Sequence, residues 1–174
     1  MSRWSTAEHT SRRLTLSIGA GVLSYAGWSW ALSYVFPLVP HDAVAEWPPG
    51  VLSGVLAGTQ ASWALLLLPL ASWAFGRLFA LEPWPHVLLA VIAGVGVDLA
   101  LRSVTGAIEL VLNDPVDLSA RAVLLGLGGV VSARATAAGT RAALTPNAEA
   151  ESVARANREA YAAKVAAEQR PPGD

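Results

Sequence analysis

The sequence predicts an all-α, polytopic membrane protein: a bundle of four transmembrane helices with a further helix at the C-terminal end. Of its 174 residues, 53% are hydrophobic and only 14% are charged, and the mean hydropathy is +0.44. Soluble chains average roughly 25% charged residues. The charged side chains also gather near the two ends of the chain and leave long apolar runs between them.

The first two predicted spans cover residues 14–36 and 51–75, each long enough for a bilayer core of ~30 Å, which needs about 20 apolar residues. Pro37 follows the first span. Pro69 lies within the second and is expected to kink it, because proline removes a backbone hydrogen bond and clashes with the preceding turn. Trp63, in the body of the same span, is expected to pack between helices.

The third and fourth predicted spans cover residues 87–112 and about 118–135. The fourth is the weakest, because Arg121 and Arg134 bracket only a short uncharged run. Together, the four spans make a transmembrane domain over residues 14–138.

Polar segments flank this domain. Residues 1–13 form an N-terminal segment, and residues 139–174 form a tail. Thr145-Pro146 is a typical helix start, so a separate tail helix is expected over about 146–169.

Arginine placement predicts the orientation through the positive-inside rule. Arg12 and Arg13 precede the first span, Arg77 lies between the second and third, and several arginines follow the fourth, whereas the other two loops contain none. Both termini are therefore expected in the cytoplasm. Of the 12 Lys and Arg residues only Lys164 is lysine, a bias that suggests a GC-rich bacterial genome and hence a bacterial inner (cytoplasmic) membrane.

A small-residue strip, Gly50, Gly54, Gly58 and Ser62, recurs at every fourth position of the second span. In lipid such strips let two helix backbones approach closely. The strip predicts a helix-packing face, which serves either packing within the bundle or a seam between copies of the chain. Gln60, off the strip, is expected to hydrogen-bond to another helix.

A polar stripe along the third span comprises Asp98, Arg102, Thr105 and Glu109, which fall on one side of a helix. Ionisable groups at membrane depth cost at least ~2.5–3.5 kcal/mol each and are candidates for function. Two interpretations remain open: a structural Asp98–Arg102 pair at i, i+4, or a path for a proton, ion or ligand. A bridge from Glu109 to Arg121 is expected to join the third and fourth spans, and Asp117 can also pair with Arg121 at i, i+4.

No motif for catalysis, cofactor binding or metal binding is present, and there is no cysteine. We therefore expect no catalytic residue, cofactor or metal, and a protein that is not an enzyme. The tail is not polybasic, so nucleic acid is not an expected partner. The expected partners are the lipid bilayer and either another protein or a second copy.

Two functions follow from these features. The first is an accessory or scaffold subunit of a membrane complex, or a homo-oligomer, that acts by helix association. The alternative is a small transporter, channel or holin-like pore with its polar path along the third span.

Overall fold

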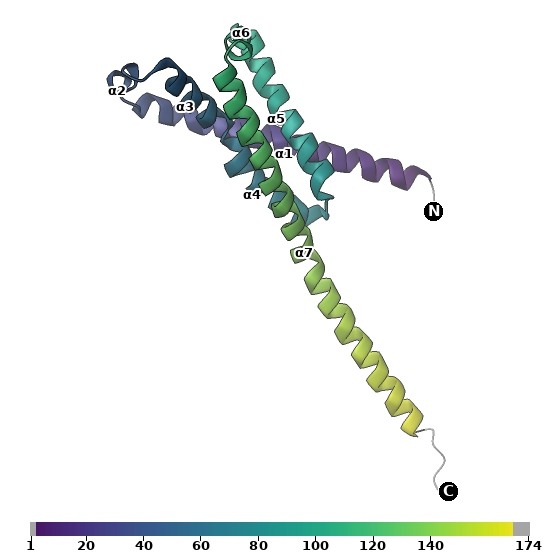
Figure 1. Ribbon diagram of the computed structural model, residues 1–174. Helices are drawn as coiled ribbons and strands as arrows, with labels where there is room; N and C mark the ends of the chain where they lie inside the picture. The colour runs from purple at the N-terminus through teal and green to yellow at the C-terminus, as the bar shows by residue number, and fades with distance from the viewer. Residues whose placement is uncertain (1–2, 169–174) are drawn as a thin grey trace.

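The computed structural model describes the backbone of residues 3–168, and side chains for residues 10–40, 42, 44–109, 111–145 and 150–162; residues 169–174 of the predicted tail lie outside it. All regular structure in this described part is helical (Figure 1). The elements are α1 (Arg3–Val35), the 3₁₀ turn η1 (Phe36–Leu38), α2 (His41–Ala45), α3 (Pro49–Ala61), α4 (Trp63–Phe79), α5 (Pro83–Thr105), α6 (Ile108–Leu112) and α7 (Pro115–Glu168).

Three helical segments in the described residues are long and apolar enough to cross a membrane: Pro49–Phe79, Pro83–Thr105 and Pro115–Ala162. They correspond to the second, third and fourth predicted spans. Helix α1, which contains the first predicted span, is not among them. The described part of the chain is thus helical, with three segments that could span a membrane.

The core lies where α1, α4 and α5 meet. Trp63 is only 2% exposed and its ring meets that of Tyr25 edge-on, with 6.1 Å between ring centroids. A Cβ added at Gly94 would collide with the Trp63 ring. Trp63 therefore packs between helices, as the sequence predicted, and the missing side chain at Gly94 makes room for it.

The second span is interrupted at Ser62, where α3 ends and α4 begins, and not at Pro69. The Ser62 hydroxyl donates to the carbonyl of Gly58 at 2.7 Å, while the Ser62 amide turns to the carbonyl of Thr59 at 3.4 Å. Serine that bonds back to the preceding turn competes with the regular helical hydrogen bond. Pro69 lies inside α4, which is assigned as one helix from Trp63 to Phe79.

The most extensive helix contact joins α4 to α7. A Cβ added at Gly128 would lie 2.5 Å from the carbonyl oxygen of Ala64, and one at Gly76 would lie 2.5 Å from that of Thr136. Between these glycines the seam is lined by fully buried side chains: Leu68, Ser72, Ser132 and Thr136. Small residues on both helices therefore bring the two backbones together.

The predicted glycine strip on α3 is not such a close-contact face. A Cβ at Gly54 would lie 3.4 Å from Val116 Cγ1, one at Gly58 would lie 3.8 Å from Leu124 Cδ1, and one at Gly50 would meet nothing within 4 Å. These are ordinary or absent contacts. The glycine strip faces α7 without close backbone contact. Within the chain, the close approach of two helix backbones occurs between α4 and α7 instead.

Helix α5 ends at Gly106, earlier than the predicted limit at residue 112. Gly106 has φ 73°, and the amide of Ala107 donates to the carbonyl of Arg102 at 2.9 Å, which is the bond that defines a Schellman C-cap. Glycine tolerates this left-handed conformation because it has no Cβ. Glu109 therefore belongs to the short helix α6 and not to the third span.

Helix α7 begins three residues before the predicted fourth span and runs without a break from Pro115 to Glu168. Asp114 caps it: its Oδ1 accepts the amides of Val116 at 2.9 Å and Asp117 at 3.2 Å. Helix α7 thus passes through Thr145-Pro146, where the sequence predicts the start of a separate tail helix. In Figure 1 the second half of α7 projects away from the other helices.

Candidate functional site

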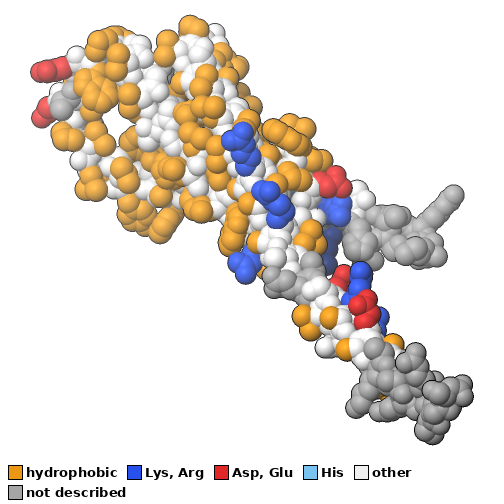
Figure 2. All heavy atoms as spheres, turned by 60° about the horizontal axis from the view of Figure 1, so that its bottom comes forward, with side chains coloured by type: hydrophobic (Ala, Val, Ile, Leu, Met, Phe, Trp, Pro, Cys, Tyr) orange, Lys and Arg blue, Asp and Glu red, His pale blue; other side chains and the backbone are white. Residues whose placement is uncertain are grey.

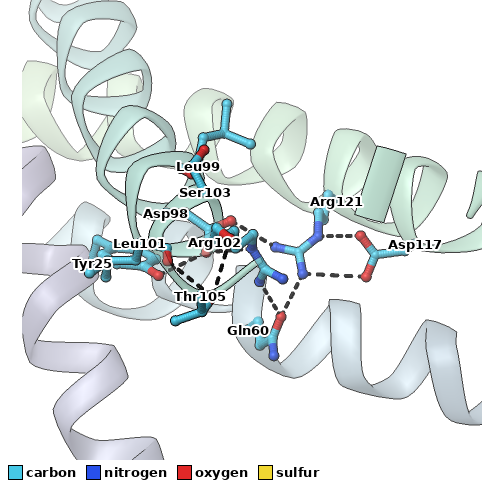
Figure 3. Close-up of polar contacts among 10 residues, drawn as sticks. All are labelled: Tyr25, Gln60, Asp98, Leu99, Leu101, Arg102, Ser103, Thr105, Asp117 and Arg121. Atoms are coloured by element: carbon cyan, nitrogen blue, oxygen red, sulfur yellow. Dashed lines mark hydrogen bonds and ion pairs between the residues drawn. The ribbon is translucent and has the colours of Figure 1, made fainter. Parts of the chain in front are cut away.

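Asp98 is the centre of a polar network between four helices (Figure 3). Its Oδ1 accepts the Tyr25 hydroxyl of α1 at 2.8 Å and the Nε of Arg102, one turn along α5, at 2.9 Å. Its Oδ2 accepts Nη1 of Arg121 from α7 at 3.2 Å. Both carboxylate oxygens therefore have charged donors, and Asp98 joins three helices.

Arg121 closes the network on its other side. Its Nε and Nη2 reach the two carboxylate oxygens of Asp117 at 2.5 Å and 3.3 Å, a bidentate arrangement. Gln60 of α3 lies between the two arginines, and its Oε1 accepts Nη2 of Arg102 and Nη2 of Arg121, each at 2.5 Å. The amide thus bridges two cations that would otherwise face each other without an intervening acceptor.

The network carries two carboxylates and two guanidinium groups, so its formal charge is zero. The side chains of Asp98, Arg102, Asp117 and Arg121 are only 11–15% exposed. Asp98 lies seven residues before the end of α5, or about 10 Å along the helix axis. A compensated charge cluster of this kind lets polar groups lie within the apolar bundle.

Compensation also makes the network sensitive to the loss of any member. Removing one partner of a buried ion pair typically costs about 3–5 kcal/mol, because the other charge stays buried without a partner. Loss of the Asp98 charge would affect both arginines at once. The network therefore joins α1, α3, α5 and α7 through side-chain contacts, and we refer to it as the pin.

A hollow of about 280 Å³ lies beside this pin. Its polar lining comprises Tyr25, Ser29, Ser33, Gln60, Asp98, Arg102 and Thr105. Hydroxyls, an amide and an ion pair in one hollow can hydrogen-bond water or a small polar solute.

The predicted polar stripe is divided by the end of α5. Asp98 and Arg102 pair as the spacing allowed, but Thr105 is exposed and bonds only back to its own helix, to the carbonyl of Leu101 at 3.1 Å and that of Arg102 at 3.2 Å. Glu109 is exposed on α6. Within the described residues, Arg121 pairs with Asp98 and Asp117 and not with Glu109, so the bridge between α5 and α7 is formed by Asp98.

The sequence predicted the inter-helix contact of Gln60 but not that of Tyr25. Gln60 bonds to other helices, as expected from a lone amide in an apolar span. Tyr25 was missed, because a tyrosine in a span is equally typical of the membrane interface. The signal that it carried was its place in the middle of the first apolar run.

Asp114 forms a second polar contact at the α6 end of the bundle. Besides capping α7, it accepts a hydrogen bond from the Ser53 hydroxyl of α3. The hydrogen bond from Ser53, followed by the backbone amides of Asp117 and Val116, lowers the pKa of the Asp114 carboxyl below its ordinary value. The charged form of Asp114 therefore joins α3 to the start of α7.

His86 lies at the opposite end of α5 and is buried against α1. The Ser17 hydroxyl donates to the carbonyl of Arg13 at 2.8 Å, and it lies 2.9 Å from His86 Nδ1. A Ser17 hydroxyl that donates to Arg13 can only accept from His86, an arrangement that requires the imidazole tautomer protonated at Nδ1. Among the described residues, no cluster of three or more His, Asp or Glu side chains is arranged to hold a metal ion.

Comparison with family models, with curated proteins and with solved structures finds no match for this chain. The functional interpretation therefore depends on the geometry of the network, the hollows and the projecting helix.

Proposed function

We propose that this protein is a small scaffold or accessory subunit of a bacterial inner membrane, which acts by associating with another membrane protein or with a second copy of itself. The observation that carries the proposal is the closed charge network of Asp98, Arg102, Asp117 and Arg121. Every charge in it has a partner on another turn or another helix. Such a network favours a fixed framework over a group that must exchange a proton or ion in each cycle.

The proposed topology has four spans, formed by α1, α3 with α4, α5, and α7. Helix α1 packs against α5 and α4, and a Cβ at Gly21 would collide with the backbone of Ala90. This close contact supports α1 as a membrane-embedded member of the bundle. The pin also explains how α7 can span: Arg121 faces the interior, so the lipid-facing apolar stretch extends beyond the short run between Arg121 and Arg134.

Charge distribution supports cytoplasmic termini. The space-filling view has acidic side chains at one tip of the molecule, and arginine side chains around the point where the long helix leaves the apolar body (Figure 2). The acidic Asp42 and Glu46 belong to the connection that contains α2. Arg12, Arg13 and Arg77 lie together near the opposite end. Under the positive-inside rule the arginine end faces the cytoplasm.

The projecting part of α7 supports a role in association. From Leu144 to Glu168 it extends about 36 Å as a helix, and its described side chains at 150–162 are all exposed. Val153 and Tyr161 are 59% and 72% exposed. A helix that reaches this far from its own core is available to a second protein or a second copy.

In-membrane crosslinking followed by mass spectrometry of the purified species tests the association. We expect the full chain to crosslink to one defined partner or to itself. The paired substitutions Val153→Ser and Tyr161→Ser should reduce that product, whereas Glu151→Gln, an exposed change on the same helix, should leave it intact. Recovery of only the uncrosslinked chain from native membranes would contradict the scaffold role.

The hollow beside Asp98 favours a second candidate, a small transporter, channel or holin-like pore. Asp98→Asn separates the two. A structural pin should lose about 3–5 kcal/mol of stability and most of the folded yield, because Arg102 and Arg121 lose their shared carboxylate. Glu109→Gln should change neither the stability nor the folded yield, since the Glu109 side chain is exposed. A conduction group would instead leave the yield of Asp98→Asn intact and alter flux through liposomes or its pH dependence.

A further inference from the structure

A basic hollow lies between α1, α4 and α7, at the other end of the bundle from the charge network. Its volume is about 470 Å³. Three arginines line it, Arg12 and Arg13 from α1 and Arg77 from the last turn of α4. Figure 2 shows arginine side chains at the border of the apolar body, near the point where the long helix leaves it.

Two of these guanidinium groups are held by aromatic rings. The Arg12 guanidinium lies 5.5 Å from the centroid of Phe79, and that of Arg77 lies 5.4 Å from the centroid of Trp73. A cation over a ring face is attracted to it, and the N–H groups of the guanidinium stay available for hydrogen bonds. Two of the three arginines are therefore positioned by aromatic rings with donors left for a ligand.

No acidic side chain lines the hollow among the described residues. Arg13 is paired with Glu82 at 3.2 Å, but both side chains are more than half exposed, and exposed pairs of this kind contribute little. Neither Arg12 nor Arg77 has an ion pair with a described side chain. The positive charge of the hollow is thus available to an anion.

The remaining walls are apolar. Leu16 of α1, Leu78 of α4 and Leu144 of α7 line the same hollow as the arginines. A ligand that fits both surfaces has an anionic head and a hydrocarbon chain. A free anion would leave these leucine walls uncovered.

We propose that this hollow binds an anionic phospholipid, with the headgroup phosphate on Arg12, Arg13 and Arg77 and an acyl chain along Leu16, Leu78 and Leu144. Guanidinium groups bind phosphate through paired, charge-assisted hydrogen bonds. Basic hollows between transmembrane helices at a membrane surface are suited to such headgroups. The site goes beyond the scaffold role and requires only that the helices lie in a bilayer, whichever side the termini face.

Native mass spectrometry of the full chain in mild detergent, with equal amounts of phosphatidylglycerol and phosphatidylcholine, tests the proposal. We expect bound phosphatidylglycerol to exceed phosphatidylcholine. The paired substitutions Arg12→Gln and Arg77→Gln should reduce that preference by about fivefold for each arginine removed. The matched control is Arg134→Gln, an exposed arginine on α7 that does not line the hollow, and it should keep the wild-type preference.

A second variant separates loss of the site from misfolding of the protein that carries both arginine substitutions. Ala143→Glu places a carboxylate at the edge of the hollow and leaves all three arginines in place, so it should also abolish the preference. Equal loss in Arg134→Gln, or no loss in both the arginine pair and Ala143→Glu, would overturn the site. Displacement of the lipid by millimolar inorganic phosphate, without any effect of acyl chains, would show a free-phosphate site instead and overturn the lipid assignment.

Discussion

Two glycine-to-alanine substitutions, Gly128→Ala and Gly54→Ala, separate the close-contact seam from the open glycine strip. An added Cβ at Gly128 would lie 2.5 Å from the backbone oxygen of Ala64, whereas one at Gly54 would lie 3.4 Å from a methyl group of Val116. The first contact is with backbone and cannot be relieved by rotating a side chain. The second is with the end of a side chain and needs at most a small adjustment.

Both substitutions lie within helices, so both gain the same helix propensity, about 1 kcal/mol for alanine over glycine. Subtracting one variant from the other removes this gain and leaves the steric effect. Overpacking of a well-packed contact typically costs about 1–3 kcal/mol. We therefore expect Gly128→Ala to be less stable than Gly54→Ala by that amount, with Gly54→Ala equal to or above the wild type.

Unfolding by sodium dodecyl sulfate in mixed micelles, followed by tryptophan fluorescence, measures the difference. Trp63 lies in the core and reports on the loss of tertiary packing. Equal stability of the two variants would refute the assignment of the seam to α4 and α7. Greater damage from Gly54→Ala would refute it more specifically, because it would mean that the strip packs closely against a second chain.

Two further predictions concern helix ends and pH. Ala80 has φ 49° and Gly106 has φ 73°, so both have a left-handed backbone. This conformation costs a residue with a Cβ about 1–2 kcal/mol. In the same micelle assay, Ala80→Gly should therefore stabilise the protein by up to about 1 kcal/mol, and Gly106→Ala should destabilise it. Because the folded-state pKa of Asp114 is lowered, its contribution to stability should be present above the unfolded-state pKa of about 4 and be lost as pH falls through the folded value. Ser53→Ala should therefore lower stability at pH 7, and the gap to the wild type should close as the pH falls below 4; a gap that is constant with pH would contradict a role for the charged form.

The sequence predicted the helical class and three of the apolar segments because hydropathy depends only on composition along the chain. It predicted the pairing of Asp98 with Arg102 because both lie on one helix at a fixed spacing. It did not predict that Arg121 would reach Asp98. That contact depends on how α7 docks on α5, which no local pattern contains.

Three predicted helix boundaries differ from the structure, at residues where the sequence carries start or end signals. Thr105-Gly106 carried the signal for a helix end, and Asp114-Pro115 carried the signal for a helix start, a capping residue followed by proline. Treating the apolar run as one span through residue 112 placed Glu109 on the wrong element. The opposite occurs at Thr145-Pro146, where a start signal lies inside a longer helix whose flanking residues are mostly Ala, Leu and Glu, which are strong helix formers.

The unbroken length of α7 gives the molecule the mechanics of a lever. The same helix is held from the charge network to Thr140, where it packs against α4, and its described side chains at 150–162 are all exposed. A tilt of the held part is therefore carried along the rest of the helix. A tilt of about 10° around Leu144 would displace the backbone at Glu168 sideways by roughly 6 Å over the ~36 Å between them. A small change in lipid thickness or packing would thus reach whatever touches the far end as a movement comparable to a full helical turn.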